Sequence, residues 1–188
     1  GAITVLFSYL LRVGAPLLFP GSIELGPQYN VATRTPALVD VSDNGEVAVR
    51  ISQQGIVEFY DADAGKPLAA FSLNKTIVAA QRVYPEVDLY ALTEADGKLS
   101  FVGTQFVISF VEGQRVLTPK LNFPFGDSEV DVGSSNLIDV QLFDGELKLL
   151  SAVAGSSQYT RTTYRNVEIG YPLGAPRSTR VETDQPIT

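Results

Sequence analysis

The chain has 188 residues and a formal net charge of −7, and it contains no cysteine, histidine, methionine or tryptophan. The missing cysteine and histidine exclude disulfides, thiolate or histidine-assisted nucleophiles, and zinc sites built on these ligands. An acidic surface repels phosphate backbones, so we expect no nucleic-acid partner.

The N-terminal stretch is apolar over residues 3–19, with Arg12 and Pro16 as exceptions. As a helix these residues would reach about 26 Å, slightly less than the roughly 30 Å hydrocarbon core of a bilayer. We expect residues 1–20 to form the end of a transmembrane or membrane-proximal helix, with Arg12 near the interface. A buried helix or strand pair of a soluble domain is the alternative. Residues 21–36 are punctuated by proline and glycine and are predicted to be a linker.

Residues 37–71 predict one four-stranded antiparallel unit. Short β-branched and aromatic runs alternate with turns that contain Gly45, Gly55 and Gly65. These glycines fall ten residues apart, the spacing of a meander of short strands. In the last turn, Asp61 and Asp63 can accept hydrogen bonds from their own backbone, and Gly65 supplies a positive φ.

Two further units of the same kind are expected. Residues 73–85 are predicted to be a connection, and residues 127–135 a polar loop. Residues 171–188 are predicted to be a C-terminal tail or linker. The predicted strands between them are 87–93, 99–102, 105–111 and 115–119 in the second unit, and 137–143, 146–153 and 158–169 in the third. The Asp-Gly pairs at 96–97 and 144–145 predict tight hairpins.

These units recur at intervals of about 45–50 residues, which is typical of propeller blades. We therefore predict an all-β fold of antiparallel four-stranded meanders over residues 37–170, a partial β-propeller of about three blade-type units. Propellers close with at least four blades. Three units imply a fragment, an oligomer or another all-β arrangement such as a sandwich.

Arg161, Thr163 and Arg165 form the candidate binding site. On one strand their side chains share a face, where two guanidiniums and a hydroxyl can hold an oxyanion. An exposed strand face rich in threonine is the simpler interpretation.

Other polar clusters are interpreted as structural. The Asp61-x-Asp63 pattern lacks the remaining ligands of a calcium loop, and the carboxylates at 94–96 and 127–131 lie in turns. We expect no metal, cofactor or catalytic residue. Six aromatic residues are predicted to pack in the core: Phe101, Phe106, Phe110, Phe123, Phe125 and Tyr164.

The order of these features resembles one family. The apolar segment that ends in Pro-Leu-Leu-Phe, the Gly-x-Val-x-Phe-x-Asp-Ala-x-x-Gly pattern at 55–65, and above all the run Val-Ile-Ser-Phe-Val-Glu-Gly-Gln-Arg-Val-Leu-Thr-Pro-Lys-Leu-Asn-Phe-Pro-Phe-Gly at 107–126 carry the resemblance. They are similar to the large, propeller-bearing permease subunits of bacterial phosphate-type ABC transporters.

The resemblance implies a non-catalytic periplasmic insertion of an inner-membrane permease for phosphate uptake. Such an insertion would act as a binding or regulatory module for other transporter subunits and a periplasmic substrate-binding protein. It implies no transport residue in this segment. A periplasmic propeller scaffold or interaction protein is the alternative, and a propeller enzyme is disfavoured by the missing histidine, cysteine and tryptophan.

Overall fold

The computed structural model describes residues 36–182 apart from 43, 134 and 154. The helix expected over 1–20 and the linker expected over 21–36, except Pro36, lie outside the described residues. Within the described part of the chain, no helix has the length and hydropathy needed to cross a membrane.

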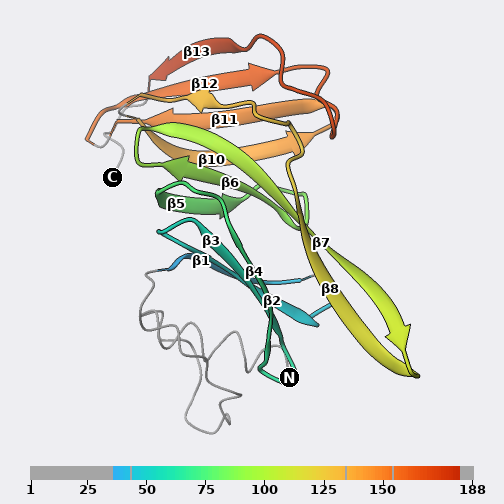
Figure 1. Cartoon of the computed structure of the whole chain (residues 1–188). Coiled ribbons are helices and arrows are strands. Elements are labelled where there is room, and N and C mark those ends of the chain that lie inside the picture. Colours follow the sequence, from blue (N-terminus) through green and yellow to red (C-terminus); the bar gives the residue numbers. More distant parts are fainter. Residues whose placement is uncertain (1–35, 43, 134, 154, 183–188) are drawn as a thin grey trace, which may run out of the picture. The chain divides into compact units, whose positions relative to one another are not determined.

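The described residues form strands in three sheets (Figure 1). The first sheet has the order β1 (Pro36–Val41), β2 (Val47–Ser52), β3 (Ile56–Asp61) and β4 (Pro67–Ser72). The middle sheet has the order β5 (Ile77–Arg82), β6 (Leu89–Glu94), β7 (Lys98–Val111) and β8 (Gln114–Asn122), and β9 (Val130–Asp131) pairs with β7. The third has the order β10 (Asn136–Phe143), β11 (Glu146–Ala152), β12 (Gln158–Tyr164) and β13 (Arg177–Glu182). The prediction of antiparallel four-stranded meanders is confirmed.

The chain divides into two compact units. Unit 1 contains the described residues up to Ala80 together with Thr104–Leu121, and unit 2 contains Gln81–Gly103 and the residues from Asn122 onward. The first sheet therefore belongs to unit 1 and the third sheet to unit 2. The long strands β7 and β8 contribute residues to both.

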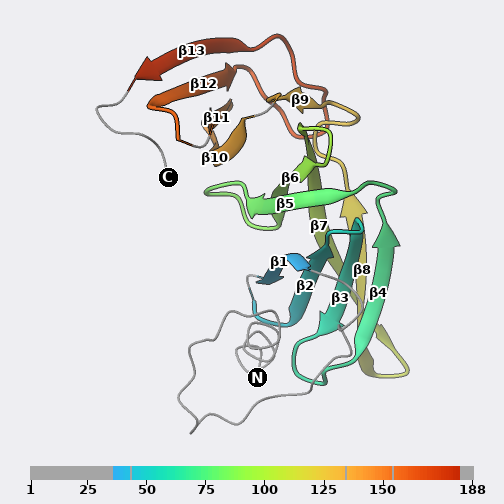
Figure 2. The ribbon, with the colours of Figure 1, turned by 90° about the vertical axis from the view of Figure 1, so that its left-hand side faces the viewer.

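The four strands of the first sheet lie side by side in chain order (Figure 2), and one face of the sheet carries Phe59. Alternate residues of β2 and β3, including Val49, Ile51 and Phe59, are fully buried on this face. The Phe59 ring makes edge-to-face contacts with Phe71 at 5.8 Å and with Phe106 of β7 at 5.9 Å between ring centroids. The aromatic contacts thus join the first sheet to the part of β7 that lies in unit 1.

The opposite face of the first sheet contains a buried ion pair. Arg50 and Glu58 are cross-strand partners, and Arg50 Nη1 lies 3.1 Å from Glu58 Oε2. The Tyr60 hydroxyl donates to the same carboxylate oxygen at 2.9 Å. Sequence reasoning missed this pair, because a charged residue in a short strand ordinarily points to solvent.

The expected turn chemistry is observed in the first sheet. The Asp61 carboxylate accepts hydrogen bonds from the backbone N–H groups of Asp63 and Ala64 at 2.9 and 2.8 Å. Gly65 has φ of 70°, so the turn interpretation of the Asp61-x-Asp63 pattern is confirmed.

The middle sheet corrects two predictions. Residues 77–82, placed in a connection, form β5, an edge strand whose apolar alternation is short. Residues 99–102 and 105–111, expected as separate strands, form the single strand β7. Gly103 lies within β7, where a Cβ would overlap the Asn122 side chain. Pro119 lies in β8, an edge strand of its sheet, which is where a residue without a backbone donor is tolerated.

The third sheet extends past its expected end. The sequence predicts a tail or linker over 171–188, but Arg177–Glu182 pair with β12 over six positions as β13. The stretch predicted as one strand over 158–169 ends at Tyr164. The core of unit 2 contains Leu99, Phe101, Phe125, Val140, Leu147, Leu149 and Tyr164, with nine-tenths or more of each residue buried.

The aromatic predictions are right for some residues and wrong for others. Phe101, Phe125 and Tyr164 are buried, and the Phe101 and Phe125 rings meet edge to face at 5.2 Å. Phe110 and Phe123 are 71% and 56% exposed. Both lie outside the buried face of a sheet, which sequence alternation alone does not reveal.

Candidate binding surface

The three predicted site residues lie at one end of β12 in unit 2. Arg161 is exposed, and Thr163, two residues further on the same face, is half-buried. Arg165 follows the last residue of the strand and is also exposed. Strand geometry therefore brings Arg161 and Thr163 to one face as predicted, and Arg165 lies just beyond it.

The register of the sheet adds two cations that sequence reasoning missed. Thr163 has Lys148 of β11 as its direct partner on one side and Arg177 of β13 on the other. Side chains of direct cross-strand partners share a face and stand about 5 Å apart at Cβ. We call Lys148, Arg161, Arg165 and Arg177 the cationic row, and the face of the third sheet that carries them the outer face.

Acidic residues offset only part of this charge. Glu146 Oε2 lies 3.3 Å from Lys148 Nζ, and Glu146 Oε1 lies 3.6 Å from Arg165 Nε. Asp139 shares the outer face, since it pairs with Leu150, which in turn pairs with Arg161. The positive excess therefore lies on the β12 and β13 side of the face.

The opposite face of the third sheet is apolar and closes the core of unit 2. Leu147, Leu149 and Tyr164 alternate with the outer-face residues and are buried. Burial raises the pKa of the Tyr164 phenol above its ordinary value of 10.0. Tyr164 is therefore neutral at physiological pH and adds no charge to the site.

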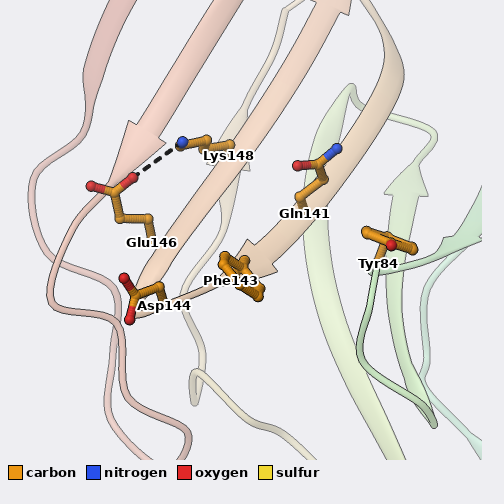
Figure 3. Close-up of a pocket in the computed structure, with 6 residues that line it drawn as sticks. All are labelled: Tyr84, Gln141, Phe143, Asp144, Glu146 and Lys148. Carbon is orange, nitrogen blue, oxygen red and sulfur yellow. Dashed lines mark ion pairs between the residues drawn. The ribbon is translucent and has the colours of Figure 1, made fainter.

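A pocket of about 470 Å³ adjoins the cationic row at the β10–β11 hairpin (Figure 3). It is lined by Tyr84, Gln141, Phe143, Asp144, Glu146 and Lys148. The backbone of Tyr84 is fixed to β10, because its N–H donates to the Val140 carbonyl at 3.1 Å and its carbonyl accepts from the Leu142 N–H at 2.8 Å.

Three of the carboxylates at 94–96 and 127–131 have local structural partners. Asp96 accepts from the Lys98 N–H at 3.0 Å, Asp131 accepts from the Gly133 N–H at 2.8 Å, and Glu129 lies 3.7 Å from Lys98 Nζ. Among the described residues, no three acidic side chains gather in the way that a metal ion would need.

No protein-family model and no curated protein matches this sequence. In structure, the chain is similar to the β-propeller domain of Cps50 (Swd1) from Myceliophteria thermophila, with a TM-score of 0.50, 8% identity, and coverage of 86% of this chain and 49% of that one. Two more distant similarities are to BamB from Moraxella catarrhalis (TM-score 0.41, 15% identity, 82% and 40% coverage) and to Hsv2p from Kluyveromyces lactis (TM-score 0.45, 14% identity, 86% and 53% coverage).

The chain thus spans about half the length of the propellers that it resembles. At 8% identity, the similarity to the Cps50 domain shows the fold alone. The antiparallel sheets of this chain are thus similar to the blades of a β-propeller.

Proposed function

We propose that the chain is a non-catalytic β-propeller interaction module that binds an acidic surface of a partner protein through the cationic row. The observation that supports this proposal is the presence of three cations around Thr163 on one sheet face, with Arg165 just beyond the strand, in a chain whose net charge is −7. A cluster of cations on a chain whose net charge is negative attracts a partner with a negatively charged surface.

The shape of the face favours a protein over a small anion. Arg161 and Arg177 are exposed and stand on a strand face, at neighbouring positions of β12 and β13. An exposed ion pair contributes about 0.2–1 kcal/mol, so four such pairs together give at most a few kcal/mol. The interaction should therefore be fast, weak and sensitive to salt.

Fluorescence anisotropy with a labelled peptide of about eight glutamates tests the proposal, at about 50 mM and about 300 mM salt. We expect the double variant Arg161→Ala/Arg177→Ala to weaken binding roughly tenfold at low salt, because the free energies of two exposed ion pairs are lost together. The matched control Lys66→Ala/Lys120→Ala removes two exposed cations outside the outer face. Equal losses in both variants would contradict the proposal.

Two single variants test the small-oxyanion hypothesis. Phosphate and sulfate are titrated against the wild-type chain and against Arg161→Ala and Arg165→Ala. Phosphate binding that both variants abolish would support a small-anion site at Arg161, Thr163 and Arg165. Unchanged phosphate affinity in both variants would contradict such a site and leave the protein partner as the ligand.

The transporter role remains a second proposal, supported by the sequence run at 107–126. Most of this run forms the β7–β8 hairpin, whose turn residues Glu112 and Gly113 have φ of 51° and 78°. Hairpin geometry accounts for the Glu-Gly pair and for Pro119 on an edge strand, but not for the rest of the motif.

In this second proposal the domain lies in the periplasm, and its partners are the other transporter subunits and a periplasmic substrate-binding protein. The open reading frame around this segment tests it. Five or more apolar spans of about 20 residues downstream would support a permease. A stop codon soon after Thr188, with a cleavable signal upstream, would contradict it.

A further inference from the structure

The pocket at the β10–β11 hairpin contains two exposed aromatic rings. Tyr84 is 66% exposed and Phe143 is 71% exposed, and both line the same pocket (Figure 3). An exposed ring keeps apolar surface in contact with water, and a bound ligand would cover that surface. Two exposed rings beside one pocket therefore favour ligand binding. The negative π face of such a ring attracts a cation.

The polar groups of the pocket are mainly hydrogen-bond acceptors. Gln141 Nε2 donates to Asp139 at 3.1 Å, which leaves Gln141 Oε1 as an acceptor. Asp144 is exposed in the hairpin turn, and within the described residues its carboxylate has no ion-pair partner. Lys148 is the only cation that lines the pocket, and it is paired with Glu146 at 3.3 Å.

We propose that this pocket binds an alkylammonium or guanidinium group. The group would lie against the Tyr84 and Phe143 rings and donate hydrogen bonds to Asp144 and Gln141 Oε1. A volume of about 470 Å³ accommodates a lysine or arginine side chain. A carboxylate ligand would be repelled by Asp144 and Glu146, and the cation that lines the pocket, Lys148, is already paired with Glu146.

The proposed cation site does not depend on the proposed function. Lys148 belongs to both the cationic row and the pocket, but Arg161 and Arg177, the two cations removed in the test of the row, do not line the pocket. Loss of peptide binding at the row would leave the pocket unaffected, and the two proposals can therefore fail separately.

Chemical-shift titration of the uniformly ¹⁵N-labelled chain tests the site. The probes are N-acetyl-lysine methylamide and N-acetyl-arginine methylamide, with the norleucine and glutamate analogues as uncharged and anionic controls. We expect the two cationic probes to shift amides at Tyr84 and in residues 141–148, and the controls to leave these amides unchanged.

Two variants remove the proposed contacts. Phe143→Ala should weaken binding of the cationic probes about fivefold or more through loss of the cation–π contact, and Asp144→Asn should weaken it further. Both residues are exposed, so neither change removes core packing. The matched controls are Phe110→Ala, at the same 71% exposure, and Asp127→Asn, an exposed aspartate outside the pocket.

A peptide with a single central lysine, flanked by glycine and serine, distinguishes the source of the cation. Tighter binding of this peptide than of the blocked lysine indicates a polypeptide ligand, and equal binding indicates a free organic cation. Binding of the norleucine analogue as tightly as the lysine probe would overturn the proposal. So would an unchanged affinity for the cationic probes in both Phe143→Ala and Asp144→Asn.

Discussion

Arg50 and Glu58 form an ion pair inside unit 1, where only 1% and 8% of their side-chain surfaces are exposed. Breaking a buried pair leaves a desolvated charge, whereas replacing both partners by apolar residues removes that cost. The change Glu58→Gln should therefore lower the free energy of unfolding by about 3 kcal/mol, measured by urea denaturation followed by circular dichroism.

The control for this prediction is Glu146→Gln on the outer face. Glu146 has ion pairs with Lys148 and Arg165 whose side chains are 52% and 62% exposed, so its loss should cost less than about 1 kcal/mol. The double variant Arg50→Met/Glu58→Leu should recover most of the stability. Equal costs for Glu58→Gln and Glu146→Gln would show that burial does not govern the Arg50–Glu58 pair.

At the scale of the element, the meanders depend on their turns. Two turn glycines with similar φ angles distinguish the cost of a left-handed backbone from the cost of a steric overlap. Gly55 and Gly145 have φ of 77° and 74°. A Cβ at Gly55 would overlap the Lys75 carbonyl oxygen, whereas a Cβ at Gly145 would meet open space.

We therefore expect Gly145→Ala to cost about 1 kcal/mol, from the left-handed conformation alone. Gly55→Ala adds an overlap with backbone that cannot move cheaply, and should cost about 2 kcal/mol more. Thermal and urea unfolding of both variants measure the difference. Equal destabilisation would mean that the Lys75 backbone adapts to the new side chain.

The hairpins were predictable because their signals are local. A glycine at a positive φ and an aspartate that accepts from the backbone two residues later act within one turn, as at Asp61 and Gly65. Strand β13 carries no such signal. All six of its residues are exposed, so no apolar alternation marks it, and its place depends on pairing with β12.

The candidate site was predictable only in part, because only some of its residues are brought together by local structure. Arg161 and Thr163 lie two residues apart on one strand, and strand geometry alone places them on one face. Lys148 and Arg177 join them through a register that involves three strands. Tyr84 reaches the pocket through an isolated bridge to Gln141, a pairing that no local pattern encodes.

At the scale of the whole molecule, propeller sheets stack face to face through apolar side chains, and the outer face of the third sheet does not fit that role. Lys148, Arg161 and Arg177 would lose their hydration beneath another sheet, at a cost of several kcal/mol for each charge without a partner. The outer face should therefore stay open to solvent in any longer polypeptide that contains this chain.

Amine labelling followed by mass spectrometry tests this expectation, with Lys98 as the matched control. The Lys148 and Lys98 side chains are 52% and 47% exposed, and each ammonium lies within 4 Å of one glutamate carboxylate. Their labelling rates should agree within about fivefold, the factor that an exposed ion pair of up to about 1 kcal/mol can make. Strong protection of Lys148 alone would mean that a further sheet or a bound partner covers the outer face. Repeating the measurement in high salt distinguishes these two cases, because only an electrostatically bound partner dissociates.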